Sequence, residues 1–209
     1  MTPRVAVIDY GSGNLRSVEK ALQKAGAEPV RCADADRIAG CDAIVLPGVG
    51  SFGDCARSLE ERGLTPALRD WLAADRPYLG ICLGYQILFE ASAESPDARG
   101  LGHWGGRAVK FQEAPGHKVP HMGWNSLAWG AQDEIFAGVA DGAYVFFVHS
   151  FYPAPTDESS VTAWCDYGVK FAAAAARGRV HGVQFHPEKS QDVGLRILEN
   201  FVQSVRETK

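Results

Sequence analysis

The sequence predicts an α/β fold: a central, mostly parallel sheet with helices on both faces and an antiparallel extension in the C-terminal half. Three observations lead to this prediction. Short apolar runs of strand length alternate with amphipathic segments as far as Cys82. Glycine-rich turns follow several of these runs. Beyond Gly106 the alternation weakens, and strand-like runs follow one another with little helix between them.

The alternating elements occupy the N-terminal half. We expect strands at residues 5–8, 29–32, 43–46 and 78–81, and helices at residues 15–25, 54–62, 66–74 and 86–90. Apolar residues three or four positions apart give the first three helices an apolar face, and Gly26 ends the first of them. In a parallel sheet covered on both faces, ligands bind at the carboxyl ends of the strands.

The C-terminal half is predicted to be rich in antiparallel strands. They are expected at residues 108–111, 144–148, 161–165, 171–176 and 179–185, and they extend the sheet or form a second, smaller one. An amphipathic helix from residue 190 onward closes the chain. The length of 209 residues suits a single domain spanning 1–209.

Composition excludes several classes of function. A net charge of -4 and a pI near 5.9 argue against nucleic acid as a partner. The N-terminus lacks the features of a secretory signal, and the chain has no apolar run near the ~20 residues of a membrane span. The chain has five cysteines, an odd number, and no C-x-x-C pair: Cys32, Cys41, Cys55, Cys82 and Cys165. We therefore expect no disulfide framework, no metal site and no cofactor. Free cysteines also favour a cytoplasmic location.

One stretch, residues 80–86, carries the strongest chemical signal. Its sequence is Gly-Ile-Cys-Leu-Gly-Tyr-Gln, with Cys82 between Gly80 and Gly84. A reactive side chain with glycine two places before and after it is typical of a nucleophile elbow, the sharp strand-to-helix turn. The free N–H groups at a helix N-terminus favour the thiolate form. The alternative is a small buried cysteine in a strand.

A glycine-rich loop, residues 47–52, follows the third predicted strand and reaches the same edge of the sheet. Backbone N–H groups near Val49 and Gly50 could approach a developing oxyanion, together with the N–H of Leu83 just after the candidate nucleophile. The alternative is that the two glycines only turn the chain.

A candidate base follows the last predicted strand. His186 and Glu188 lie two residues apart, and in an extended chain positions i and i+2 point the same way. A carboxylate beside an imidazole fixes its tautomer and stabilises the imidazolium. The alternative is a surface strand end with incidental charges. Residues 120–125, Pro-His-Met-Gly-Trp-Asn, are either a packed loop or a binding surface.

Together, the elbow, the glycine loop and the downstream His-x-Glu predict a Cys82, His186 and Glu188 triad that attacks a carboxamide or ester and forms a thioester. With its segments 80–86 and 182–188, the chain resembles the class I, triad-type glutamine amidotransferases, which have a flavodoxin-like fold. The resemblance implies hydrolysis of glutamine to glutamate and ammonia. It also implies oxyanion donors at Val49 and Leu83 and a glutamine site formed by Gly50, Gln86, His149, Ser150 and Phe151.

Segments 9–18, 47–50, 120–125 and 186–190 resemble one branch of that family, the separate glutaminase subunits of histidine biosynthesis. The resemblance implies a heterodimer with a cyclase subunit of the (β/α)8-barrel type, which receives the ammonia. It assigns a set of residues to the partner interface: Tyr10, Asn14, His121, Met122, Trp124, Asn125, Tyr144 and Lys189. Tyr85, Gln191 and segment 102–106 depart from the usual pattern, and none of them belongs to the triad.

Two other functions remain open from the sequence. Amidotransferases of pyridoxal phosphate, anthranilate or guanylate synthesis share the triad but are expected to lack Pro-His-Met-Gly-Trp-Asn. A regulatory module on the same fold could use Cys82 as a redox sensor. His186 and Glu188 argue against a sensor, because a sensor needs no proton shuttle.

Overall fold

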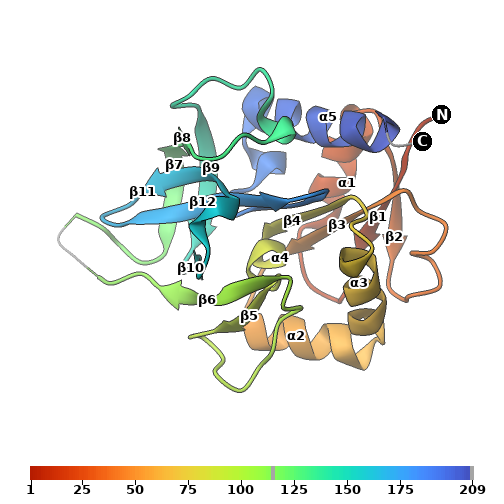
Figure 1. Cartoon of the computed structure of the whole chain (residues 1–209), viewed down its shortest axis with the longest axis horizontal. Coiled ribbons are helices and arrows are strands. Elements are labelled where there is room, and N and C mark those ends of the chain that lie inside the picture. Colours follow the sequence, from red (N-terminus) through yellow and green to blue (C-terminus); the bar gives the residue numbers. More distant parts are fainter. Residues whose placement is uncertain (114–115, 208–209) are drawn as a thin grey trace.

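The computed structural model describes residues 1–113 and 116–207. Its main sheet has eight strands (Figure 1). In spatial order they are β2 (Glu28–Cys32), β1 (Arg4–Ile8), β3 (Ala43–Gly48), β4 (Tyr78–Cys82), β13 (Val180–Val183), β12 (Lys170–Arg177), β11 (Val161–Asp166) and β8 (Ala128–Trp129). The first five run parallel and the last three pair antiparallel. The predicted fold class is therefore confirmed.

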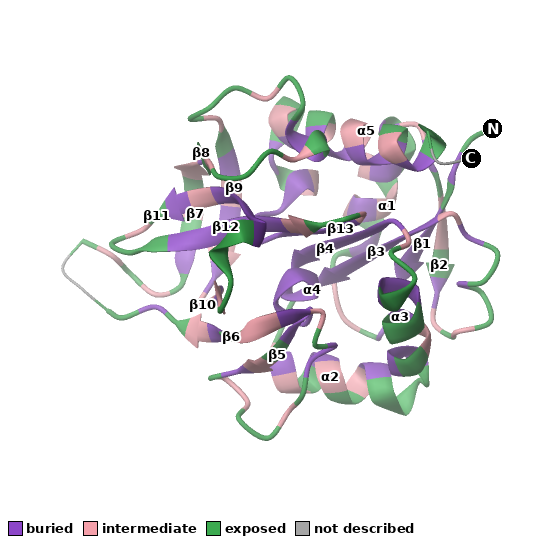
Figure 2. Ribbon diagram, in the orientation of Figure 1, coloured by how far each residue is buried: buried purple, intermediate pink, exposed green. Residues whose placement is uncertain are grey.

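Helices cover both faces of the parallel part (Figure 1). On one face lie α1 (Leu15–Lys24) and α5 (Gln191–Glu207); on the other lie α2 (Phe52–Glu61) and α3 (Leu64–Ala73). The alternation of β1 explains this arrangement, because Val5 and Val7 pack toward α1 and α5 while Ala6 and Ile8 pack toward α2 and α3. Figure 2 shows the resulting buried strands between half-exposed helices.

Two smaller sheets adjoin the main one. The first consists of β10 (Phe151–Pro155), β6 (Trp104–Lys110) and β5 (Phe89–Ser92), and the second of β7 (His121–Ser126) and β9 (Tyr144–His149). The short helices are α4 (Leu83–Gln86), η1 (Glu134–Phe136), η2 (Glu158–Ser160) and η3 (Pro187–Lys189). Among the described residues, we find no helix with the length and apolarity needed to cross a membrane.

The elbow helix lies earlier in the chain than predicted. It spans Leu83–Gln86 and so ends where the predicted helix, 86–90, was to begin; residues 87–88 form a turn, and Phe89 begins β5. The carbonyls of Ile87 and Leu88 accept hydrogen bonds from the N–H groups of Leu101 and Trp104, which belong to a distant segment. These tertiary hydrogen bonds take the place of the intrahelical bonds that a longer helix would need.

Candidate active site

Cys82 stands at the tip of a strained turn between β4 and α4. Its φ is +55° and its ψ is -105°, an unusual conformation for a residue with a side chain. A Cβ on Gly84 would lie 1.8 Å from the carbonyl oxygen of Leu46, and a Cβ on Gly80 would lie 2.3 Å from that of Gly84. Both glycines are therefore needed, because a backbone carbonyl of the same turn lies too close to Gly80 for a side chain and one of β3 lies too close to Gly84. This is the nucleophile elbow that the sequence predicted.

The glycine loop lies directly beside the elbow. Gly48 is the register partner of Cys82 between β3 and β4, and a Cβ on Gly48 would lie 2.8 Å from the Cβ of Leu83. The carbonyl of Val49 accepts hydrogen bonds from Ser12 Oγ at 3.1 Å and Tyr10 Oη at 3.5 Å. The backbone of Val49 is thus held next to the turn that carries Cys82.

His186 and Glu188 form an aligned and buried pair. His186 Nδ1 donates to Glu188 Oε1 at 2.8 Å, and the two side chains are 3% and 2% exposed. The predicted pairing is present, but its expected geometry was wrong. Only His186 is extended, whereas Pro187–Lys189 form a 3-10 turn, which brings the carboxylate back to the ring. Ser190 Oγ donates to the carbonyl of His186 at 2.7 Å and fixes the turn.

The electrostatics of His186 are set by its neighbours. Burial lowers its pKa, but its contact with Cys82, the hydrogen bond that it donates to Glu188 and its coulombic interactions with both side chains outweigh burial and raise the pKa to about 10. Its Nε2 atom is buried without an aligned hydrogen-bond partner. The ring can therefore carry a proton beside the thiol and has one nitrogen available for a reacting group.

A pocket of about 320 Å³ opens at Cys82. Its wall includes both predicted oxyanion residues and all five predicted glutamine-site residues: Val49, Gly50, Leu83, Gln86, His149, Ser150 and Phe151. The topology brings them together because the loops after β3, β4 and β9 meet at one edge of the parallel sheet (Figure 1). Three lining residues, Glu94, Pro120 and Val148, were not predicted.

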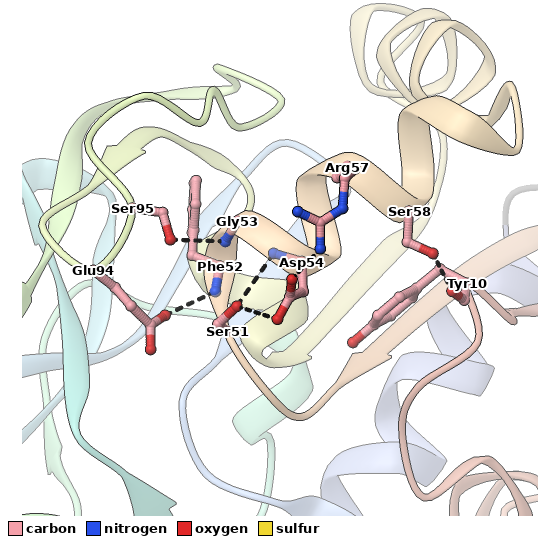
Figure 3. Close-up of polar contacts among 9 residues, drawn as sticks. All are labelled: Tyr10, Ser51, Phe52, Gly53, Asp54, Arg57, Ser58, Glu94 and Ser95. Carbon is pink, nitrogen blue, oxygen red and sulfur yellow. Dashed lines mark hydrogen bonds and ion pairs between the residues drawn. The ribbon is translucent and has the colours of Figure 1, made fainter.

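Glu94 brings a carboxylate to this pocket. Its Oε2 accepts the N–H of Phe52 at 2.7 Å, and the adjacent Ser95 Oγ accepts the N–H of Gly53 at 3.1 Å (Figure 3). Ser51 caps the same helix by accepting the N–H of Asp54. The loop after β5 is thus attached to the N-terminus of α2. No local sequence pattern connects Glu94 with a helix that begins 42 positions earlier.

Two glutamine side chains connect Cys82 with the opposite wall. Gln184 Nε2 donates to Cys82 Sγ at 3.5 Å, and Gln86 Nε2 donates to Gln184 Oε1 at 3.0 Å and to the carbonyl of Phe151 at 2.8 Å. The amide protons of Gln86 are therefore committed within the protein. Gln86 lines the pocket, but its amide group holds the wall in place.

Most of the residues assigned to a partner interface lie at the surface. Met122, Trp124 and Tyr144 are 64%, 46% and 60% exposed and occupy one face of the β7/β9 pair. Asn14 and Lys189 are exposed and Asn125 is half-buried. Two residues depart from the prediction, since Tyr10 and His121 are only 3% and 2% exposed. Tyr10 lies under the Val49 loop and His121 lies on the inner face of β7.

Comparison with known proteins agrees with this geometry. The family model for glutamine amidotransferase class-I matches residues 6–205, so the chain belongs to this family. Among curated relatives, imidazole glycerol phosphate synthase subunit HisH of Geobacter sulfurreducens is 47% identical and covers 95% of this chain and 97% of its own length. The HisH subunit of Methylococcus capsulatus is 48% identical, with 95% of each chain covered. Within the family, the chain is thus similar to HisH.

Solved structures support the fold. PurLQS from Thermotoga maritima has a TM-score of 0.76 with 23% identity, and the match covers 100% of this chain and 99% of that one. A structure described as a glutamine amidotransferase has a TM-score of 0.74 with 20% identity, covering 95% of this chain and 98% of its own. No group of three or more potential ligand side chains placed for a metal ion occurs among residues 1–113 and 116–207.

Proposed function

We propose that the chain is the glutaminase subunit of an imidazole glycerol phosphate synthase, the complex named in its HisH relatives. It hydrolyses glutamine to glutamate and ammonia, and a partner subunit uses the ammonia in histidine biosynthesis. The observation that carries the proposal is the position of Cys82 on a strained elbow, beside a buried His186 and Glu188 pair, at the mouth of a pocket.

The chemistry follows from these three residues. The thiolate of Cys82 attacks the carboxamide carbon of glutamine, and the tetrahedral intermediate collapses to a thioester when ammonia leaves. His186 Nε2 gives its proton to the leaving nitrogen and then takes a proton from the water that hydrolyses the thioester. Glu188 keeps the proton on Nδ1, so that Nε2 faces the chemistry.

The pocket offers complementary groups to the rest of the substrate. The carboxylate of Glu94 is suited to the α-ammonium group of glutamine, because it is the acidic side chain on the wall that Gly50, Ser150 and Phe151 complete. Leu83 is the first residue of α4, so its N–H has no intrahelical acceptor and can donate to the oxyanion.

We assign the second oxyanion donor to the N–H of Val49 and propose that it is regulated. Ser12 and Tyr10 hold the Val49 carbonyl and thereby fix the peptide that joins Val49 to Gly50, which restricts the backbone of Val49. Binding of the partner releases this hold and lets the Val49 N–H turn toward the oxyanion. Val49 is 40% exposed and therefore accessible to a partner.

The partner is a cyclase of the (β/α)8-barrel type in a heterodimer. It docks on the exposed apolar face formed by Met122, Trp124 and Tyr144, which an unpartnered protein rarely presents so close to its active site. An apolar lining around Met122 and Trp124 suits neutral ammonia, because it would not hold the ammonium ion. The chain forms one domain, 1–209, and acts in the cytoplasm, where its five free thiols are stable.

The test is ammonia release from glutamine by the purified chain, alone and with a cognate cyclase barrel and its ribotide ligand. We expect strong stimulation by the liganded partner and loss of the activity in Cys82→Ala. Rapid hydrolysis that ignores the partner would contradict the histidine-pathway assignment. No release under either condition would contradict the glutaminase itself.

A further inference from the structure

The two strands β7 and β9 form a ribbon with chemically different faces. Met122, Trp124 and Tyr144 lie on the outer face. His121 and Asn125 lie on the inner face, and His121 is the register partner of His149. The inner face thus carries polar side chains in a position where a half-buried strand normally buries apolar ones.

These polar side chains form one continuous chain of hydrogen bonds. His149 Nδ1 lies 2.8 Å from the carbonyl of Phe151, His121 Nδ1 lies 3.1 Å from His149 Nε2, and Asn125 Nδ2 lies 3.3 Å from His121 Nε2. Asn125 Nδ2 also donates to the carbonyl of Asp166 at 2.8 Å, and its Oδ1 accepts the N–H of Ser126. The orientation of the Asn125 amide is fixed by these last two bonds.

The groups at the two ends of this hydrogen-bonded series determine which atom donates and which accepts in each bond. A carbonyl only accepts, so His149 carries its proton on Nδ1 and its Nε2 must accept. His121 then donates from Nδ1 and accepts on Nε2 from the Asn125 amide. Burial lowers the pKa of His149 to about 3 and that of His121 to about 4, so both rings are neutral near neutral pH.

The carbonyl of Phe151, at the end of this hydrogen-bonded series, belongs to a residue of the pocket at Cys82. Phe151 lines that pocket, and its carbonyl accepts from both His149 Nδ1 and Gln86 Nε2, each at 2.8 Å. The two lone pairs of this carbonyl are therefore occupied, and the peptide that joins Phe151 to Tyr152 cannot rotate without breaking both bonds. The inner face of the ribbon thus determines the position of one wall of the pocket.

We propose that Asn125, His121 and His149 form a positioning relay that holds the backbone carbonyl of Phe151, and with it one wall of the pocket, in the geometry that binds glutamine. The inference rests on the proposed glutaminase function for its kinetic part. His121 and Asn125 act through His149 and do not touch the substrate. Stacking of the His121 ring on Tyr167 at 4.0 Å and on Phe147 at 4.7 Å fixes the orientation of that ring.

The first arm of the test is independent of glutamine. Long-range proton–nitrogen NMR on the chain labelled with ¹⁵N-histidine reports the tautomer of each ring. The relay predicts neutral rings with the proton on Nδ1 for both His121 and His149 at about pH 7. Signals are assigned with His121→Phe, which keeps the stacking ring, and with His103→Phe, a control at a half-buried histidine outside the relay whose pKa is also lowered by burial. A proton on Nε2 in either relay ring would overturn the proposal.

The second arm measures glutamine kinetics at a saturating concentration of the cyclase partner. His121→Phe and Asn125→Asp should each raise KM for glutamine about tenfold with kcat changed less than about threefold, since each breaks the same hydrogen-bonded chain. The double variant should be no worse than either single variant. Unchanged KM, or effects that multiply, would overturn the proposal. If the wild type hydrolyses no glutamine, the proposed function fails while the tautomers still decide the relay.

Discussion

Two buried histidine–carboxylate pairs lie at the two ends of β13, and only one of them faces a nucleophile. His186 donates to Glu188 through an aligned bond and contacts Cys82. His181 Nδ1 lies 3.1 Å from Asp133 Oδ1 without hydrogen-bond alignment, and both side chains are at most 3% exposed. Asp133 uses the same oxygen to cap η1 through the N–H of Ile135.

The difference teaches that a buried histidine next to an acid is not by itself a catalytic signal. The His181 pair connects β13 to η1 under α5, and neither of its residues lines the pocket at Cys82. The His186 pair is connected through Ser190 to β9 and lies beside the elbow. Only the His186 pair lies next to a thiol, a glycine loop and a pocket, and for this reason we propose that it is the catalytic pair.

Removal of the proposed nucleophile is expected to have the largest effect. Cys82→Ala should lower glutamine hydrolysis at least about 10⁴-fold, because a triad acts as a unit and loses its covalent step. The fold should be retained, which circular dichroism checks. A variant that kept a tenth of the activity would show that the thiol is not the reacting group.

A smaller loss is expected when the catalytic histidine loses its orienting partner. Glu188→Gln should reduce kcat by about 10²- to 10⁴-fold, because the amide no longer fixes the proton on Nδ1 or stabilises the imidazolium. Steady-state kinetics with the partner present measure this. Equal activity in Glu188→Gln and the wild type would show that the His186 and Glu188 pair, like the His181 and Asp133 pair, is not needed for catalysis.

The oxyanion donor is a feature that the His181 pair lacks. Val49→Pro removes the N–H of this residue and should reduce partner-stimulated kcat by about 10²- to 10³-fold. Val49→Ala keeps the N–H and serves as the matched control, with stimulation close to that of the wild type. Undiminished stimulation in Val49→Pro would exclude the proposed donor.

The raised pKa of His186 predicts a dependence of stability on pH. Because the folded pKa of about 10 exceeds the ordinary value of 6.5, the group stabilises the fold fully below about pH 6.5, and this stabilisation is lost as the pH rises toward 10. The free energy of unfolding, measured with urea, should therefore fall over that pH range more steeply for the wild type than for His186→Gln. If the free energy of unfolding depended on pH in the same way in both proteins, the result would contradict the assigned charge pairing of His186.

The smallest expected effect on catalysis comes from the other pair. Asp133→Ala should destabilise the protein by about 3 kcal/mol, because it removes a buried partner of His181 and the cap of η1. The kcat per folded molecule should stay within about twofold of the wild type. A large loss of kcat with unchanged stability would give this pair a role in catalysis.

The sequence allowed the elbow, the glycine loop and the triad to be predicted because each depends on neighbours in the chain or on strand order. It failed where distant segments decide the outcome. Glu94 reaches the pocket only through its contact with Phe52, and α4 ends at Gln86 because Leu101 and Trp104 take the next carbonyls.

The ribbon strand β7 was missed for a different reason. Its residues do alternate, with His121 and Asn125 inward and Met122 and Trp124 outward. The inward side chains are polar and the outward ones apolar, the reverse of the usual pattern, so hydropathy gave no strand signal. We interpret the inverted pattern as functional, because the proposed relay occupies the inner face and the proposed partner site occupies the outer face.

The most direct measurement of the central claim is to treat the complex with an electrophilic diazoketone analogue of glutamine and map the product by mass spectrometry. The account predicts one modification, on Cys82, that excess glutamine prevents and that Cys82→Ala abolishes. Modification of Cys32, Cys41, Cys55 or Cys165 instead, or the absence of any adduct in the stimulated complex, would contradict it.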